Sequence, residues 1–356
     1  MNRKAGRGRT LLWAALLTTL LLTTCQTESR QHVQPTPAFY HWKQTYTPQA
    51  NALYDTSTVQ TLYVRFFDVD WDEATRQPVP KSAVAFRAKP MARTVVPVVF
   101  IMNRTLLNLR PASVPELARR LVQKVGQLAQ RQHITYPELQ IDCDWTRATR
   151  SRYFALLKAI GQQARVPLSA TIRLHQVKFV AQTGVPPVRR GMLMAYNIGD
   201  YRRPDVRNSI LDLDDLGQYA DYLPGYPLPL DLALPLFRWT VIFRNGRVLA
   251  LRNHLDAAQV RAGAASRPPF VTAQPDTTRF VVSRDTTVWG VSLRRGDQLR
   301  TEAVSADDLR AAKTLLLTKL PDETRTLTLY HLDSAVLAHY PYAALHSLFA
   351  QPRPAP

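Results

Sequence analysis

The sequence predicts an α/β protein built as a (β/α)8 barrel of the TIM type, with a small β insertion near the C-terminus. Short apolar runs alternate with segments of helical periodicity along most of the 356 residues. This alternation favours parallel strands joined by right-handed helical crossovers. Eight such units in about 310 residues suit the size of a barrel. An open doubly wound sheet is the alternative, but no glycine-rich phosphate loop follows any of the apolar runs.

The eight expected strands are apolar runs that end in polar residues. They cover residues 39–42, 61–71, 95–103, 138–145, 167–175, 191–197, 234–239 and 326–333. Most are followed by a helical pattern, and the helix after residue 113 is the clearest. Ser113 and Glu116 have the spacing of a capping box, and Leu117, Leu121 and Val125 continue as an apolar stripe.

The remaining segments give the expected β insertion, the further helices and the C-terminal tail. Asn245-Gly246 predicts a hairpin turn, and short β segments follow it, which places the β insertion at about 240–303 within a barrel spanning 39–350. Further helices are expected at 48–55, around 153–160, at 305–317 and at 337–348. Residues 351–356 are expected to form a disordered tail.

The N-terminus has the pattern of a targeting segment. Four basic residues among the first ten precede an apolar stretch at 11–22, which is too short to span a bilayer comfortably. Cys25 then follows, and the whole resembles a bacterial lipoprotein signal. That resemblance implies a signal peptide at 1–24, a lipid on Cys25, a flexible tether at 25–38 and attachment to the outer membrane of the cell envelope. An ordinary signal peptide or an N-terminal anchor helix is the alternative.

The charge and the cysteine content of the chain limit which classes of partner and which kinds of site we expect. The formal net charge is +19, but the basic residues are scattered singly and no nucleic-acid motif is present. We therefore expect no nucleic-acid partner, whereas salt-sensitive binding of an anionic polymer stays open. Cys25 and Cys143 are the two cysteines of the chain, which excludes a disulfide framework and a cysteine-based zinc site.

Polar residues at the strand ends predict a pocket. Asp142 and Asp144 close the fourth strand and point to the same face, because strand residues two apart do so. In a parallel barrel the carboxyl ends of all strands meet at one face, where active sites of this fold lie. The other polar strand ends are His41, Trp42, Asp68, Asp70, Asn103, Arg173, His175, Tyr196, Asn197, Arg238, Trp239, His331 and Asp333. This mixture of aromatic rings, carboxylates and arginines is typical of a sugar site.

The fourth and sixth strands resemble those of family-18 glycoside hydrolases, the chitinase-like enzymes. Their fourth strand reads Asp-Gly-x-Asp-x-Asp-Trp-Glu, and Asp142, Asp144 and Trp145 match its second Asp, third Asp and Trp. Leu139 replaces the first Asp and Thr146 the catalytic Glu. Their sixth strand carries Met-x-Tyr-Asp, which residues 194–197 match as Met-Ala-Tyr-Asn. The whole chain also resembles lipoproteins of Bacteroidetes-type bacteria.

The resemblance implies that a glutamate would protonate the glycosidic oxygen while the neighbouring Asp orients the substrate amide, and Thr146 cannot replace that glutamate. Hydrolysis would then need another acid, so the catalytic candidates are Asp142, Asp144 and Asp70, with Asp68 and Asp333 as further donors. Hydrolysis that retains the anomeric configuration through an enzymic nucleophile needs two carboxyls about 5–5.5 Å apart, and hydrolysis that inverts it needs them about 6.5–9.5 Å apart. If these aspartates packed closely, repulsion between their charges would raise the pKa of one carboxyl. Arg65 or Arg173 could instead neutralise them.

The sequence thus predicts a cell-envelope lipoprotein whose glycoside-hydrolase-like barrel acts on or binds glycan; the alternative is a non-catalytic glycan-binding or scaffold protein. The expected substrate-binding residues are Trp42, Asp68, Asn103, Arg173, His175, Tyr196, Asn197, Trp239 and Asp333. No cofactor is expected. A divalent ion on Asp142, Asp144, His175 and His331 is conceivable chemically, but no metal-ligand spacing supports it, so no metal is expected.

Overall fold

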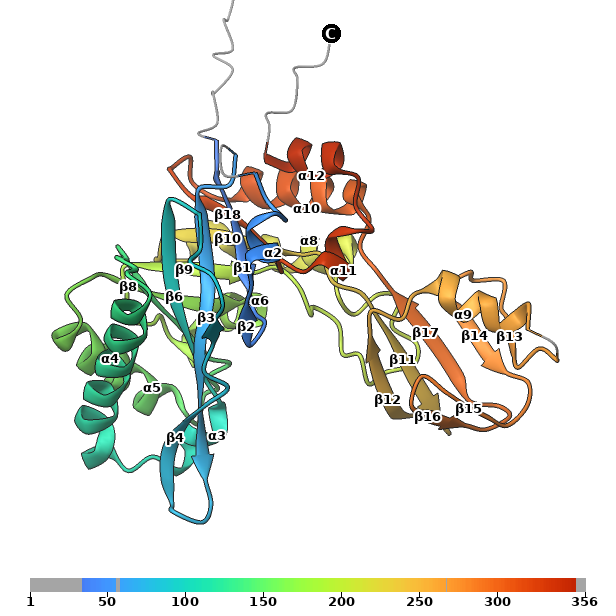
Figure 1. Ribbon diagram of the computed structural model, residues 1–356, viewed down its shortest axis with the longest axis horizontal. Coiled ribbons are helices and arrows are strands. Elements are labelled where there is room, and N and C mark those ends of the chain that lie inside the picture. Colours follow the sequence, from blue (N-terminus) through green and yellow to red (C-terminus); the bar gives the residue numbers. More distant parts are fainter. Residues whose placement is uncertain (1–33, 56–57, 267, 350–356) are drawn as a thin grey trace, which may run out of the picture. The chain divides into compact units, whose positions relative to one another are not determined.

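Eight parallel strands close into a barrel in the computed structural model, which describes residues 34–55, 58–266 and 268–349 (Figure 1). The first strand pairs with the last and also with the next strand of the ring, so the described sheet closes on itself. In ring order the strands are β1 (Thr36–His41), β3 (Thr61–Asp72), β6 (Thr94–Ile101), β7 (Leu139–Asp142), β8 (Leu168–Arg173), β9 (Arg190–Met194), β10 (Leu230–Pro235) and β18 (Thr326–Tyr330). The predicted (β/α)8 barrel is confirmed.

The barrel interior is filled by side chains at alternate strand positions, as the pleat requires. Ala38 and Tyr40 of β1 face inward with Val96 and Val98 of β6. Tyr63, Met192, Met194, Tyr196 and Ala233 complete this inner cluster. The opposite strand faces pack against helices in a second and larger cluster. Both faces are therefore covered, which explains why the strands are nearly continuous apolar runs.

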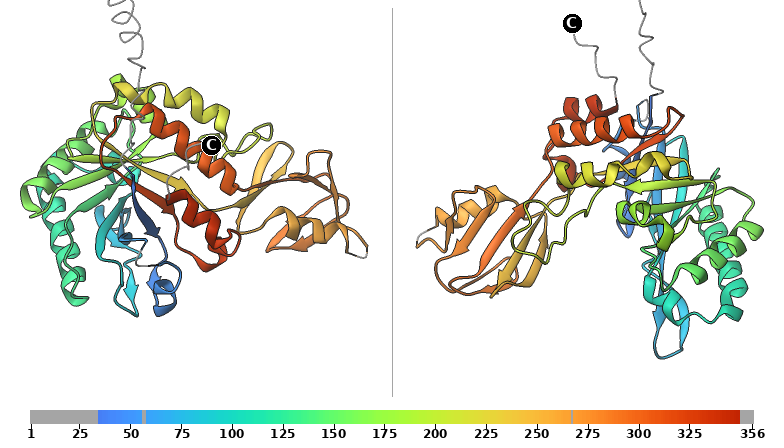
Figure 2. Two further views of the ribbon diagram at one scale, coloured as in Figure 1. Left: turned by 90° about the horizontal axis from the view of Figure 1, so that it is seen from above. Right: turned by 180° about the vertical axis from the view of Figure 1, so that it is seen from behind.

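The helices lie outside the ring of strands (Figure 2). They are α2 (Pro48–Asn51), α3 (Asn103–Asn108), α4 (Val114–Arg131), α5 (Arg150–Gln163), α6 (Leu174–Lys178), α7 (Val180–Thr183), α8 (Leu213–Ala220), α10 (Ala306–Lys319), α11 (Ser334–Leu337) and α12 (Tyr342–Phe349), with 3-10 turns η1 (Pro111–Ser113) and η2 (Leu223–Gly225). The apolar stripe of α4 is buried at Leu117, Leu121 and Val125 as predicted. None of the helices in the described ranges is long and apolar enough to cross a membrane.

The capping box predicted at Ser113 is wrong. Ser113 ends the turn η1 with helical backbone angles and makes no capping hydrogen bond. Pro111 starts that turn one residue after Arg110, so the chain is already helical before α4 begins. Glu116 forms ion pairs with Arg119 and Arg120 instead.

An antiparallel sheet with its own core lies between β10 and β18. Its strands are β12 (Arg247–Asn253), β11 (Trp239–Arg244), β17 (Gln298–Glu302), β14 (Arg279–Val282) and β13 (Val271–Ala273) in spatial order, and β15 (Thr286–Val288) and β16 (Val291–Leu293) form a separate ribbon. Helix α9 (Ala257–Ala264) packs beside β13 and was not predicted. Ile242, Phe280 and Leu299 belong to its core. Asn245 and Gly246 both adopt positive φ, as the predicted hairpin turn requires.

Several boundaries differ from the expected ones. The seventh barrel strand ends at Pro235, so neither Arg238 nor Trp239 ends that strand: Arg238 lies in the connection, and Trp239 begins the inserted sheet. Strand β1 begins at Thr36, so the last residues assigned to the tether pair with β18. Outside the ring, β4 (Gln77–Lys81) extends β3 as a hairpin, and β2 (Thr45–Tyr46) pairs with β5 (Ala85–Phe86). The expected signal peptide, Cys25 and the C-terminal tail lie outside the described residues.

We predict that Gly191→Ala lowers the free energy of unfolding by about 1–3 kcal/mol. A Cβ at this position in β9 would lie 2.7 Å from Ile172 Cγ1 and 2.8 Å from Leu230 Cδ2. Gly126→Ala in α4 is the control, since its Cβ would meet nothing within 4 Å and alanine favours a helix. Urea unfolding of both variants measures the difference; an equal effect of the two substitutions would contradict the tight packing at β9.

Candidate functional site

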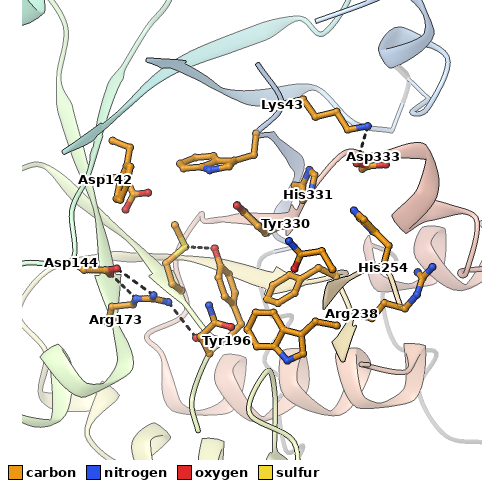
Figure 3. Close-up of a pocket in the computed structure, with 17 residues that line it drawn as sticks. Lys43, Asp142, Asp144, Arg173, Tyr196, Arg238, His254, Tyr330, His331 and Asp333 are labelled. Atoms are coloured by element: carbon orange, nitrogen blue, oxygen red, sulfur yellow. Dashed lines mark hydrogen bonds and ion pairs between the residues drawn. The ribbon is translucent and has the colours of Figure 1, made fainter. Parts of the chain in front are cut away.

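A cavity of about 560 Å³ opens at the carboxyl ends of the barrel strands (Figure 3). Residues from β1, β6, β7, β8, β9 and β18 reach it together with the start of the inserted sheet. Its lining consists of Trp42, Lys43, Phe100, Asp142, Asp144, Arg173, Met194, Tyr196, Asn197, Phe237, Arg238, Trp239, Asn253, His254, Tyr330, His331 and Asp333. The cavity lies where ligands bind in parallel barrels.

Asp142 ends β7 and is the carboxyl of the cavity with the most perturbed acidity. The Thr171 hydroxyl on β8 donates a hydrogen bond to Asp142 Oδ1 at 2.6 Å. Burial, followed by repulsion from Asp144, raises the pKa of Asp142 to about 7. No ion pair to this carboxyl is formed within the described residues. Asp142 is therefore partly protonated at neutral pH and can donate as well as accept a hydrogen bond.

Asp144 is exposed and its charge is balanced by Arg173. Arg173 Nε donates to Asp144 Oδ1 at 2.7 Å, and the second guanidinium nitrogen Nη2 lies 3.4 Å from Oδ2. The same guanidinium lies 6.0 Å from the Tyr196 ring centroid and 3.4 Å from the Tyr196 carbonyl oxygen. The ion pair thus joins the segment after β7 to the end of β8, and the contact with Tyr196 continues to the segment after β9.

Aromatic rings form the floor of the cavity around Tyr330. Its ring centroid lies 5.6 Å from that of Trp42, 5.3 Å from that of Tyr196 and 5.9 Å from that of Phe237. The Tyr196 hydroxyl donates to Met194 Sδ at 3.0 Å. Close ring packing of this kind fixes the side-chain positions, so the floor is preformed.

Trp239 is held at the cavity by the inserted sheet. Its indole Nε1 donates to Glu302 Oε2 at 2.9 Å, and its ring lies 5.3 Å from Phe237 between centroids. Glu302 is buried and also accepts hydrogen bonds from the Ser209 backbone N–H and hydroxyl and from Arg300 Nε. Because all these donors converge on one carboxylate, the orientation of Trp239 depends on the inserted sheet and on the segment after β9.

The structure brings most of the sequence-predicted site residues together. Trp42, Asp142, Asp144, Arg173, Tyr196, Asn197, Trp239 and Asp333 line the cavity. His175 instead lines an adjacent cavity of about 280 Å³ with Thr146 and Tyr219. Asn103 accepts a hydrogen bond from the Thr149 hydroxyl at 2.7 Å at the start of α3 and does not line either cavity.

The carboxylates of β3 lie away from the cavity lining. Asp70 is bound by Arg104, whose Nε donates at 2.6 Å, and by Lys81 at 3.0 Å. The Arg104 hydrogen bond holds the pKa of Asp70 well below its ordinary value, so this group remains ionised and is a poor proton donor. Asp68 lies 3.5 Å from Arg65, while burial raises its pKa.

Sequence reasoning missed several lining residues. Tyr330 directly precedes the predicted polar end of β18, whereas Phe100 and Phe237 lie in or beside apolar runs. In the sequence, these positions cannot be told apart from those of ordinary core residues. Asn253 and His254 come from the end of β12 in the inserted sheet, and no sequence signal brings that strand to the barrel. Lys43 follows Trp42 and pairs with Asp333 at 2.8 Å.

Thr146 occupies the position of the expected catalytic glutamate. Its side chain is exposed, and its backbone N–H donates to the Thr149 hydroxyl at 2.9 Å. A hydroxyl in this place cannot supply a proton at neutral pH. In the ranges that the structure describes, no three His, Cys, Asp or Glu side chains are grouped closely enough to hold a metal ion.

Known proteins resemble this chain in structure. No protein-family model and no curated protein sequence matches it. The chitinase from Chromobacterium violaceum ATCC 12472 superposes with a TM-score of 0.53 at 12% identity over 89% of this chain and 99% of that one. The Bacillus cereus spore cortex-lytic enzyme SleL gives 0.52 at 11% identity over 89% and 74%. The Ostrinia furnacalis Group IV chitinase gives 0.50 at 10% identity over 88% and 98%.

By fold the chain is therefore a chitinase-like TIM barrel, and the fold resemblance predicted from the fourth and sixth strands is confirmed. Identities this low show the architecture alone. The chemistry has to be argued from the residues of this chain.

We predict that Asp142→Asn gains stability relative to the wild type as pH rises from 5 to 8, by about 1–3 kcal/mol. The wild-type carboxyl has a folded-state pKa raised to about 7, so it favours folding at low pH and loses that contribution as pH rises through 7. The amide does not ionise. Urea unfolding at both pH values measures this, and a pH-independent difference would contradict the raised pKa.

Asp144→Asn is predicted to lower the pKa of Asp142. The substitution removes a repelling carboxylate and also frees Arg173, and both changes favour the ionised form of Asp142. Carboxyl carbon NMR titration of the aspartates measures the shift against the wild type. An unchanged or raised Asp142 pKa would show that the two groups do not interact.

Proposed function

We propose that this protein binds glycan in the cavity at the carboxyl ends of the barrel strands and does not cleave it. The proposal rests on three observations taken together: the preformed aromatic floor, one carboxyl (Asp142) that forms no ion pair with any described residue, and Thr146 at the position of the chitinase-type acid. Flat rings bind the apolar faces of sugar rings, while polar side chains bind the hydroxyls. The cavity offers both kinds of surface.

The floor and the carboxyl lie on adjoining sides of the cavity. Trp42 lines the cavity together with Tyr330 and Asp142, and Figure 3 shows Tyr330 and Asp142 among the lining side chains. A partly protonated carboxyl donates one hydrogen bond and accepts others, which suits the paired donor and acceptor character of sugar hydroxyls. Asn197 adds an amide to the cavity lining.

The charges of the cavity argue against a two-carboxyl hydrolysis. Besides Asp142, the lining carboxylates are Asp144 and Asp333, which form ion pairs with Arg173 and Lys43 at 2.7 and 2.8 Å. A glycosidase that uses an enzymic base or nucleophile needs an acid together with a second carboxylate that is free to act in that role. An ion-paired carboxylate is a weaker base and nucleophile, so the geometry supports binding better than cleavage.

Hydrolysis with Asp142 as the acid is the second candidate function. The pKa of about 7 at Asp142 favours it, because general acids work best with a pKa near the operating pH. This alternative predicts that glycan turnover is measurable and is abolished by Asp142→Asn.

We also propose a location in the cell envelope, attached to the outer membrane by lipid on Cys25. The basic and apolar pattern before Cys25 supports this proposal. Radiolabelled palmitate should enter the wild-type chain in a bacterial host and not the Cys25→Ser variant. Equal labelling of both chains, or of neither, would contradict lipidation at this cysteine.

Calorimetry with the tetramer of N-acetylglucosamine tests the binding proposal. We expect saturable binding by the wild type and at least tenfold weaker binding by Trp42→Ala, a loss of about 1.4 kcal/mol, because a ring of the floor is removed. Trp71→Ala is the matched control, since Trp71 lies on β3 outside this cavity. Equal loss in both variants, or no binding by the wild type, would contradict the proposal.

Product analysis separates binding from cleavage. Incubation of the wild type with the same tetramer is expected to release no shorter oligomers. Turnover that disappears in Asp142→Asn, with the variant still folded, would establish the hydrolytic alternative instead.

A further inference from the structure

The side of the cavity opposite Asp142 and Asp144 is lined by basic side chains. Figure 3 shows Lys43, His331, His254 and Arg238 on that side. His331 and Lys43 follow β18 and β1 of the barrel, whereas Arg238 and His254 flank strands of the inserted sheet. We call Arg238, His254 and His331 the basic wall.

The basic wall has hydrogen-bonding atoms without partners. Arg238 Nε, His254 Nδ1 and His331 Nδ1 are shielded from solvent and make no hydrogen bond with any described residue. Arg238 is 7% exposed. Its Nε lies 3.5 Å from Asp256 Oδ2, an ion-pair contact without hydrogen-bond geometry. Buried polar atoms are normally satisfied, so these three residues, all in the lining of one cavity, have unused hydrogen-bonding capacity.

The charge on this side is also incompletely balanced. Lys43 has a carboxylate at 2.8 Å, whereas the carboxylate of Asp256 lies 3.5 Å from Arg238, whose Nη1 also donates to the Ala335 carbonyl at 3.4 Å. Burial lowers the pKa of Arg238 and lowers that of His331 to about 4, which indicates that the wall is desolvated. An anion placed there would relieve the cost of burying the guanidinium.

We propose that the glycan recognised by this cavity carries a carboxylate substituent, which binds to Arg238, His254 and His331. The inference rests on the proposed glycan binding. The guanidinium and the imidazole N–H groups donate to the carboxylate oxygens, a charge-assisted arrangement, while the sugar hydroxyls face Asp142 and Asp144 across the aromatic floor. The net charge of +19 favours the approach of an acidic glycan.

Two disaccharides that differ in this charge alone test the proposal. One joins N-acetylglucosamine to N-acetylmuramic acid, whose lactyl group ends in a carboxylate, and the other carries the amide of that group. Calorimetry should show at least tenfold tighter binding of the acid, as expected for a hydrogen-bonded charge. Raising NaCl from 0.05 to 0.5 M should narrow the ratio of affinities, because salt screens the charge.

Variants of the basic wall locate the effect. Arg238→Gln and His254→Gln should each reduce the ratio of acid to amide affinity severalfold. Because His254 is only partly buried, His254→Gln still tests the proposal if Arg238→Gln fails to fold. Arg120→Gln removes one positive charge from α4, outside the cavity, and should keep the ratio. An equal fall in all three variants would assign the preference to net charge and overturn the proposed subsite.

The N-acetylglucosamine tetramer is measured alongside the two disaccharides. If the tetramer binds and the acid binds no tighter than its amide, the carboxylate subsite is wrong and the glycan-binding proposal stands. If none of the three sugars binds, both proposals fail.

Discussion

Closure of the barrel by β1 is the constraint on which the site depends. Because β1 pairs with β18 on one side and with β3 on the other, the carboxyl ends of strands far apart in sequence meet around one opening. Trp42, Asp142, Tyr196 and Tyr330 come from four different strand ends and share one cavity only for this reason. Inward-facing side chains such as Tyr40 fill the space beneath, so the floor is supported by a packed interior.

The sequence predicted the parts of this structure that depend on local pattern. Alternating apolar runs identified the barrel, and both Asp142 and Asp144 line the cavity, although β7 ends at Asp142 and Asp144 lies in the loop after it. Contacts that depend on long-range geometry were not predictable. Asp70 has the same strand-end pattern as Asp142, yet the β3 hairpin carries it to Arg104 and Lys81. His254 enters the cavity because a whole inserted sheet folds against the barrel opening, which no local pattern encodes.

Asp142 and Thr146 show how a shared architecture can support different chemistry. The fourth strand keeps the two aspartates of the chitinase-like pattern, and Arg173 neutralises one of them. Residue 146 carries a hydroxyl, and burial, followed by repulsion from Asp144, raises the pKa of Asp142 to about 7. A partly protonated carboxyl can both donate and accept a hydrogen bond, and the other lining carboxylates, Asp144 and Asp333, are held in ion pairs. The aromatic floor of the cavity and the threonine at residue 146 are the two features on which the binding proposal rests.

A crystal structure of the protein soaked with the N-acetylglucosamine tetramer tests this account most directly. We expect an intact oligosaccharide in the cavity, with one sugar ring against Trp42 or Tyr330 and a hydroxyl within hydrogen-bonding distance of Asp142. Shortened sugar in the cavity would show that the barrel cleaves glycan. Sugar bound elsewhere, with the cavity empty, would contradict the assignment of the site.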